Sequence, residues 1–292
     1  MPFIETRDGT RLYVKSWGGG RPVVLIHGWP LSGDSWDPVM NALADAGFQA
    51  IAYDRRGFGR SDQPSDGYDY DTFADDLREV VQQCAGGEAA LVGFSMGGGE
   101  VVRYMSRHEG RGIERVILVS SVVPYLLKTS ANPHGVEHAV FDDMTEQMMR
   151  DRAKFWSSFF PQFYGVGLLS HPVSDEVIQW SRQMAMQASL KATLACANAF
   201  ATTDFHADLP SLTVPTLVIH GTADKTVPID CTGRQVAAAV PHSRLLEYDG
   251  APHGLFASHK FELVNDVLRF VATGVVEDQT GVVTNTPIQT PY

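Results

Sequence analysis

Residues 91–100 read Leu-Val-Gly-Phe-Ser-Met-Gly-Gly-Gly-Glu and place Ser95 between Gly93 and Gly97, which is the G-x-S-x-G pattern. The apolar run before the serine has the composition of a strand, and helix-compatible sequence follows at Met96. The pattern predicts a sharp turn from strand to helix that presents the serine hydroxyl, because backbones pass too closely at the flanking positions to admit a Cβ atom. The alternative is a glycine-rich turn with an incidental serine, so the partners of Ser95 must decide.

Seven further strand patterns surround this stretch. The pair at 3–6 and 11–17 alternates around Asp8-Gly9, a strong hairpin signal, and predicts two antiparallel strands. A continuous apolar, mainly β-branched run at 23–26 is typical of a strand buried on both faces of a parallel sheet. In addition to the strand at 89–94 that precedes Ser95, further strands are expected at 48–53, 113–120, 216–220 and 243–248. Helices are expected at 36–46, 70–84, 96–108, 231–240 and 260–273. This alternation predicts an α/β fold with a mostly parallel, eight-stranded sheet flanked by helices.

The regular alternation breaks after the sixth expected strand. There the sequence becomes helical and rich in methionine and aromatic residues, which indicates a helical lid. We expect a core from 1–122 and 210–273, a lid from 123–209, and a C-terminal tail from 274–292 that is either frayed or held across the surface.

The composition predicts a globular protein and argues against several kinds of partner. Hydrophobic residues make up 44% of the chain, and 34 acidic against 23 basic residues leave a net charge of -11, which would repel nucleic acid and anionic membranes. No uncharged apolar run approaches the ~20 residues that a membrane span needs. Cys84, Cys196 and Cys231 form no C-x-x-C pair, which suits a reducing compartment. We therefore expect a cytoplasmic protein.

A serine nucleophile needs a base and an acid, and both are expected C-terminal to it, after late strands. The strand at 216–220 leads to Asp224, and the strand at 243–248 leads to His253. Since carboxyl ends of parallel strands share one edge of the sheet, we expect these side chains to meet Ser95 there. Asp230 and Asp249 are rival acids, although their surroundings are typical of a helix start and a turn.

Two backbone N–H groups are candidates for an oxyanion hole. Met96 follows the serine at the start of a helix, and Trp29 follows the strand at 23–26 in His27-Gly28-Trp29-Pro30. For His27 we favour a structural role that braces this loop over direct proton transfer.

The chain resembles the α/β-hydrolases, and within them the cofactor-free bacterial haloperoxidases, or perhydrolases, and related aryl esterases. The resemblance extends from residue 2 to 273 and is carried by the segments at 27–36, 53–61, 68–77 and 93–100. It implies a triad of Ser95, Asp224 and His253, an oxyanion hole at Trp29 and Met96, and no cofactor or metal. It also implies an acyl-enzyme attacked by water, or by hydrogen peroxide to give a peracid that oxidises halide. Family members with proline at the position of Pro30 resemble the better perhydrolases.

The substrate is expected to be a small ester or a peroxide, and self-association is possible. We expect substrate contacts from Phe94, Pro30, Val122, Phe155, Trp156 and Phe159. Because the lid and the tail depart from the family, a lactone or another carbonyl compound is the alternative substrate.

Other functions fit less well. The H-x-x-E-H zinc pattern from His134 to His138 needs a regular helix, which Pro133 and Gly135 oppose. The glycine clusters lack the Lys-Ser or Lys-Thr of a phosphate-binding loop. Dehalogenases and epoxide hydrolases use a carboxylate nucleophile where this chain has Ser95. A ligand-binding receptor without turnover is a further hypothesis, which the complete triad opposes.

Overall fold

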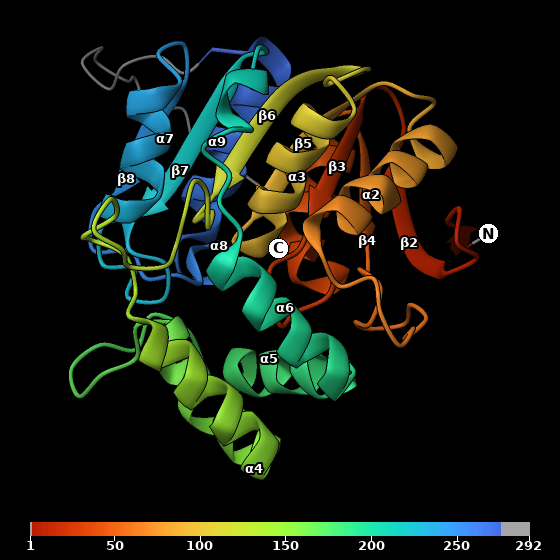
Figure 1. Cartoon of the computed structure of the whole chain (residues 1–292). Coiled ribbons are helices and arrows are strands. Elements are labelled where there is room, and N and C mark those ends of the chain that lie inside the picture. The colour runs from red at the N-terminus through yellow and green to blue at the C-terminus, as the bar shows by residue number, and fades with distance from the viewer. Residues whose placement is uncertain (1, 276–292) are drawn as a thin grey trace.

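The computed structural model describes residues 2–275 and contains the predicted eight strands (Figure 1). They are β1 (Phe3–Glu5), β2 (Arg11–Gly18), β3 (Pro22–Ile26), β4 (Gln49–Tyr53), β5 (Ala89–Phe94), β6 (Ile113–Val119), β7 (Thr216–Gly221) and β8 (Arg244–Tyr248). The strands form one sheet in the order β1-β2-β4-β3-β5-β6-β7-β8. The β1–β2 and β2–β4 pairs are antiparallel and all others are parallel, which confirms the predicted α/β sheet.

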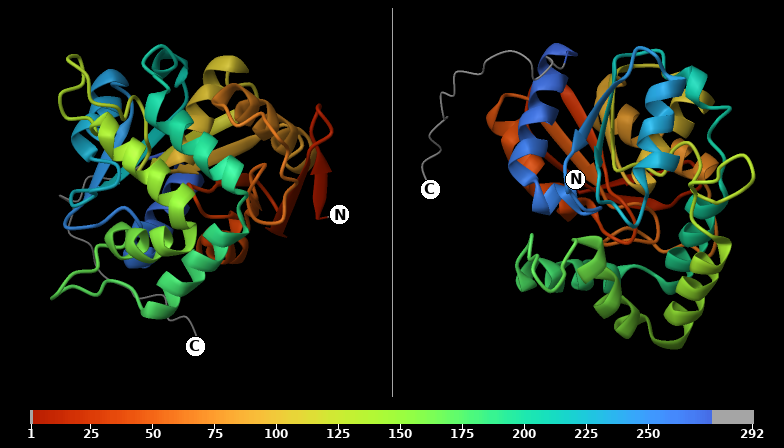
Figure 2. Two further views of the ribbon diagram at one scale, coloured as in Figure 1. Left: turned by 60° about the horizontal axis from the view of Figure 1, so that its bottom comes forward. Right: turned by 90° about the vertical axis from the view of Figure 1, so that its left-hand side faces the viewer.

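Helices cover both faces of this sheet. The helices of the described residues are α1 (Asp37–Asp45), α2 (Tyr70–Cys84), α3 (Met96–Arg107), α4 (His138–Phe163), α5 (Asp175–Gln187), α6 (Leu190–Thr202), α7 (Gly233–Ala239), α8 (Leu255–Ser258) and α9 (Lys260–Thr273). α1 packs against α9, and α2 packs against α3. Figure 2 (right) shows α7 and α9 on opposite faces of the sheet.

The local sequence explains the central elements. All six residues of β5 are buried, as are the last four residues of β3, because helices cover the sheet on both sides. α2 begins where the carboxylate of Asp69 accepts the N–H of Thr72 at 2.9 Å. Its predicted apolar face, Phe73, Leu77, Val80 and Val81, is buried.

The strand register aligns the carboxyl ends of the central strands. Ile26 of β3 lies beside Gly93 of β5, and Phe94 lies beside Val119 of β6. Val119 in turn lies beside Ile219 of β7. The loops that follow these strands therefore start from one edge of the sheet, where the sequence predicts the site.

Three helices, α4, α5 and α6, are inserted after the sixth strand, as the sequence predicts. They lie together at the lower end of the molecule in Figure 1, below the sheet. α4 is interrupted at Asp151, whose backbone is extended (φ -161°, ψ 88°), and so it consists of two shorter helices.

Most boundaries agree with the predicted ones, and the differences are small. The expected helix at 231–240 begins with a 3-10 turn, Ile229–Cys231, before α7. The short helix α8 was not predicted. His134 lies in a turn and α4 begins at His138, so the H-x-x-E-H residues do not share a helix. From residue 276 on, the predicted tail lies outside the described residues.

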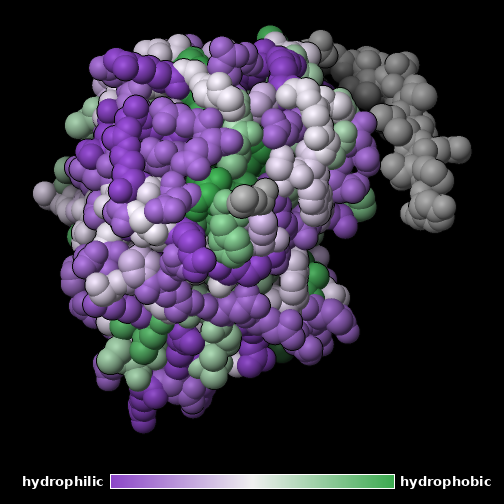
Figure 3. Space-filling view, turned by 90° about the vertical axis from the view of Figure 1, so that its right-hand side faces the viewer, coloured by the Kyte–Doolittle hydropathy of each residue, from purple (hydrophilic) through white to green (hydrophobic). Residues whose placement is uncertain are grey.

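The face in Figure 3 is mainly hydrophilic and carries hydrophobic residues in smaller patches. Among the described helices, none is long and apolar enough to cross a membrane.

Candidate active site

Ser95 occupies the turn between β5 and α3. Its backbone adopts φ 55° and ψ -119°, a conformation that costs a non-glycine residue about 1–3 kcal/mol and is found mainly at functional sites. A Cβ on Gly93 would lie 2.5 Å from the carbonyl oxygen of Gly97, and a Cβ on Gly97 would lie 2.5 Å from that of Ile26. The predicted need for glycine on both sides of the serine is therefore confirmed.

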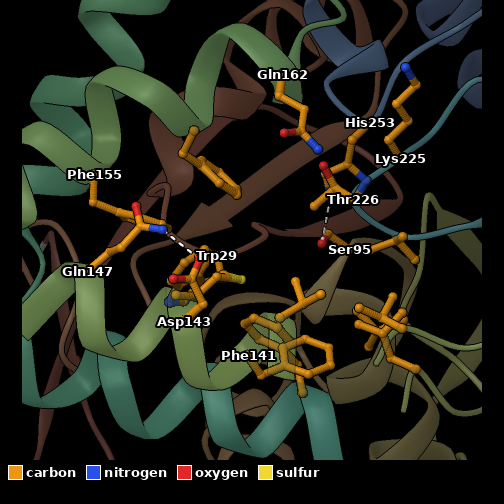
Figure 4. Close-up of a pocket in the computed structure, with 18 of the residues that line it drawn as sticks. Trp29, Ser95, Phe141, Asp143, Gln147, Phe155, Gln162, Lys225, Thr226 and His253 are labelled. Atoms are coloured by element: carbon orange, nitrogen blue, oxygen red, sulfur yellow. Dashed lines mark hydrogen bonds between the residues drawn. The ribbon is translucent and has the colours of Figure 1, made fainter. Parts of the chain in front are cut away.

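The structure brings together the three residues that the sequence selects. His253 Nε2 lies 2.9 Å from Ser95 Oγ, and His253 Nδ1 lies 2.6 Å from Asp224 Oδ2. The contact with Ser95 is drawn as a dashed line in Figure 4. All three residues are buried. With Nδ1–H directed at the carboxylate, Nε2 can accept the serine proton.

Asp224 is held as a carboxylate by the loop after β7. Its Oδ1 accepts the N–H groups of Thr226 at 2.9 Å and Val227 at 2.8 Å. Burial alone would raise the pKa of Asp224, but the neighbouring His253 and hydrogen bonds from His220 and His253 lower it well below its usual value. An ionised Asp224 can fix the orientation and tautomer of His253.

The rival acids lie elsewhere and have other partners. Asp230 is exposed and pairs with Arg234 at 2.6 Å. Asp249 is also exposed and accepts the hydroxyl of Thr222 at 3.3 Å. Asp224 is thus the acid that this geometry selects.

The predicted oxyanion donors lie next to the nucleophile. Met96 is the first residue of α3, where N–H groups have no acceptor within the helix. A Cβ on Gly28 would lie 2.6 Å from the ring of Phe94 and 2.9 Å from Ser95 Cβ, so the backbone that leads into Trp29 lies against the serine. Trp29 and Met96 thus flank Ser95 in the chain's fold, and their N–H groups stay the predicted oxyanion donors.

His27 braces this loop from the buried side. Its Nε2 accepts the N–H of Arg55 at 3.0 Å, and its Nδ1 donates to the carbonyl of Gly28 at 3.0 Å. Burial lowers the pKa of His27 well below its usual value, and the Arg55 guanidinium lowers it further. The imidazole stays neutral and bound to backbone at both nitrogens, which fits the expected bracing role.

A cavity of about 270 Å³ opens above Ser95 and His253. Figure 4 shows Trp29 and Phe155 on one side of it, and Gln162, Lys225 and Thr226 on the side of His253. Val122, Phe155 and Phe159 line the cavity as expected, and Trp29 does so as well. The other apolar side chains in the lining are Leu126, Val136, Val140, Phe141, Met144, Phe200 and Val227.

Three expected substrate contacts are not on the cavity wall, because Phe94, Pro30 and Trp156 are absent from the lining. Phe94 lies beside the catalytic imidazole, with its ring centroid 5.1 Å from that of His253. Pro30 is buried in its loop. Trp156 is fully buried and contacts Trp29 edge to face at 5.1 Å.

Helical periodicity explains the error at Trp156. Phe155, Ser158, Phe159 and Gln162 follow a spacing of three and four residues and line the cavity. Trp156 and Phe160 are four residues apart and each follows a cavity-lining residue by one position, so they lie on a neighbouring face of the helix, where they are buried in the core. A run of aromatic residues on one helix thus faces two environments.

Comparison with known proteins places this geometry in a family. Residues 21–260 match the family described as "alpha/beta hydrolase fold". The chain belongs to the α/β-hydrolases. It is 40% identical over 273 residues to a non-heme chloroperoxidase of Kitasatospora aureofaciens, and 38% identical over 275 residues to a bifunctional esterase/perhydrolase of Acinetobacter calcoaceticus. Each match covers 93% of this chain and 99% of the relative.

A solved structure supports the same placement. The crystal structure of a bromoperoxidase from Bacillus anthracis superposes with a TM-score of 0.87 and 42% identity, and the match covers 90% of this chain and 96% of that one. The resemblance to the haloperoxidase and perhydrolase family is therefore confirmed, and this α/β-hydrolase is an enzyme.

The sequence analysis of this α/β-hydrolase missed His220. Its Nε2 donates to the carbonyl of Val227 at 2.9 Å and lies 3.4 Å from Asp224 Oδ2. Its Nδ1 is buried and has no hydrogen-bond partner among the described residues. The available signal was its place at the end of β7, four residues before the acid.

A buried ion pair between Arg55 and Glu100 was also missed. Arg55 Nε donates to Glu100 Oε2 at 2.7 Å, and the hydroxyl of Tyr53 donates to the other oxygen of Glu100. Both charged side chains are fully buried. The pair ties the first half of α3 to the loop after β4, and therefore supports the turn at Ser95.

Among the described residues, no group of three or more histidine, cysteine, aspartate or glutamate side chains is arranged to hold a metal ion.

Proposed function

We propose that this α/β-hydrolase cleaves small carboxylic esters through an acyl-enzyme at Ser95. The observation that carries the proposal is the continuous contact from Ser95 through His253 to Asp224 at the floor of a mainly apolar cavity. This arrangement provides a nucleophile, a base and an oriented acid next to space for an apolar acyl group.

The first half of the reaction forms the acyl-enzyme. Ser95 Oγ attacks the ester carbonyl while His253 Nε2 takes its proton. The N–H groups of Trp29 and Met96 stabilise the negative oxygen of the tetrahedral intermediate. When this intermediate collapses, the bond to the alcohol breaks and His253 returns the proton to the leaving oxygen.

The second half releases the acyl group. His253 takes a proton from water, whose oxygen attacks the acyl-enzyme. The bond between the acyl carbon and Ser95 Oγ then breaks, His253 returns the proton to Oγ, and the products are a carboxylic acid and free Ser95. Hydrogen peroxide in place of water gives a peracid by the same proton transfers. Perhydrolysis is proposed because two similar proteins are named as a chloroperoxidase and an esterase/perhydrolase. The peracid would then oxidise halide without further help from the protein.

The helices α4, α5 and α6 are proposed to act as the lid of this site. Most of the cavity wall opposite Ser95 comes from α4, including Phe141, Met144, Phe155 and Phe159. The proposed division is a lid from 123–209 on a core formed by 1–122 and 210–273. Cytoplasmic location and self-association stay predictions.

The proposal is tested with 4-nitrophenyl acetate and Ser95→Ala. We expect multiple turnovers by the wild-type enzyme and loss of turnover in the variant, with an unchanged circular dichroism spectrum. Bromination of monochlorodimedone in the presence of acetate, bromide and peroxide should also require Ser95. Full esterase activity in the variant would refute the mechanism, and a preference for lactones over aryl acetates would favour the lactonase alternative.

A further inference from the structure

A surface groove of about 700 Å³ adjoins the cavity and shares Ser158, Gln162 and Lys225 with it. The end of α4, the loop that follows it and the loops around Ala223 and Gly250 form its walls. These three side chains lie at the boundary between the two spaces, so their polar atoms are within reach of a substrate that extends from Ser95 toward the groove. In Figure 4, Gln162 and Lys225 lie on the His253 side of the cavity.

The charge of this groove is unusual for so acidic a protein. Lys225 is the only lysine or arginine among the described residues that line the cavity or the groove. No aspartate or glutamate of the described chain lines the groove. In a chain with a net charge of -11, an opening with one cation and no anion is suited to an acidic ligand.

The donors at this opening are available to a ligand. Within residues 2–275, Lys225 is exposed and takes part in no ion pair or hydrogen bond through its ammonium group. The side-chain amide of Gln162 is likewise exposed and has no partner in that range. An ammonium and a carboxamide N–H are both donors that a carboxylate can accept.

The opposite end of the cavity differs in charge. Gln147 there donates to Asp143 at 2.6 Å, and the adjoining groove contains both acidic and basic side chains. Its charged residues are Asp143, Arg150, Asp151 and Lys154. A negatively charged group is therefore favoured on the Lys225 side.

We infer that the groove binds a carboxylate carried by the substrate, away from the scissile carbonyl. The substrate class is then a carboxylic ester with a free carboxylate on its acyl or its alcohol part. This inference rests on the proposed function and adds Lys225 as the residue that determines specificity, with Gln162 as a second donor.

The test compares matched charged and neutral esters. Monomethyl adipate is paired with methyl hexanoate for a carboxylate on the acyl part, and 4-acetoxybenzoate with phenyl acetate for one on the alcohol part. In at least one pair, we expect Lys225→Met to lower the charged-to-neutral ratio of kcat/KM tenfold or more, mainly through KM. Lys225→Arg should keep most of the ratio, because the positive charge remains.

Lys154→Met is the matched control, since Lys154 lines neither the cavity nor the Lys225 groove and should leave both ratios as in the wild type. Ratios that change less than twofold in Lys225→Met for both pairs would overturn the inference. So would an equal change in Lys154→Met. The proposed function fails separately, if the wild-type enzyme hydrolyses none of the four esters in a manner that depends on Ser95.

Discussion

Asp224 contacts His253 through Oδ2 at 2.6 Å, while its Oδ1 accepts two backbone N–H groups, from Thr226 and Val227. The carboxylate thus has one oxygen for the imidazole and one for the loop. Because the two oxygens have different partners, the effect of Asp224→Asn on activity can be predicted.

Asp224→Asn should lower kcat by about 10⁴-fold without loss of the fold. The amide oxygen will take the place of Oδ1, because only an oxygen can accept from Thr226 and Val227. The amide N–H₂ then donates to His253 Nδ1, so the imidazole carries its proton on Nε2. A protonated Nε2 can no longer accept the proton of Ser95. Ester hydrolysis and a crystal structure of the variant would check this. Activity within tenfold of the wild type would contradict the role of Asp224.

The same substitution should change how stability depends on pH. The folded-state pKa of Asp224 lies below its ordinary value of 3.8, so the ionised carboxylate stabilises the fold above that value, and this contribution is lost as the pH falls through the folded-state pKa. Between about pH 5 and about pH 3, the free energy of unfolding should fall more steeply in the wild type than in Asp224→Asn. Urea denaturation across this range measures the difference. Equal slopes would mean that the pKa is not lowered.

Gly97→Ala should destabilise the protein by at least about 1–3 kcal/mol. The added Cβ would lie 2.5 Å from the carbonyl oxygen of Ile26, so α3 and β3 would have to separate. Gly19→Ala is the control, because no atom lies within 4 Å of its added Cβ. Urea denaturation measures the free energy of unfolding of both variants. Equal stabilities would show that the close packing at the turn is not required.

Phe141→Ala should shift the acyl preference toward longer chains. Removing this ring from the cavity wall makes room for methylenes, each worth about 0.8 kcal/mol when buried. The ratio of kcat/KM for 4-nitrophenyl octanoate to that for the acetate should therefore rise several-fold.

Phe141→Leu provides a milder version of this change if the alanine variant folds poorly. Trp156→Phe is the control, since the indole Nε1 has no partner among the described residues and the ring does not line the cavity. An unchanged chain-length profile in both Phe141 variants would exclude this wall from the acyl site.

The sequence was most informative where one physical pattern dominates. Continuous apolar runs such as 23–26 and 89–94 can be buried only in a sheet covered on both sides, and this predicted the core strands. Ser95, Asp224 and His253 follow the parallel strands β5, β7 and β8, and this placement predicted their convergence, because parallel strands end at one edge.

The sequence was less informative where the rotation of a helix about its axis decides which side chains line the cavity. Phe155 and Trp156 are adjacent and similar, yet one lines the cavity and the other is buried behind it. Phe200 lines the cavity because of the way α6 packs against it, and the sequence pattern of α6 does not reveal that packing. His220 resembles any strand residue until the fold brings its Nε2 to the acid.

The most direct test of the account is covalent labelling of the nucleophile. A 4-nitrophenyl phosphonate ester should add one phosphonyl group per chain, and peptide mass spectrometry should locate it on Ser95. His253→Ala should slow the labelling by at least about 100-fold, because the general base is lost. A label on another residue, or equally fast labelling in His253→Ala, would contradict the proposed catalysis by Ser95 and His253.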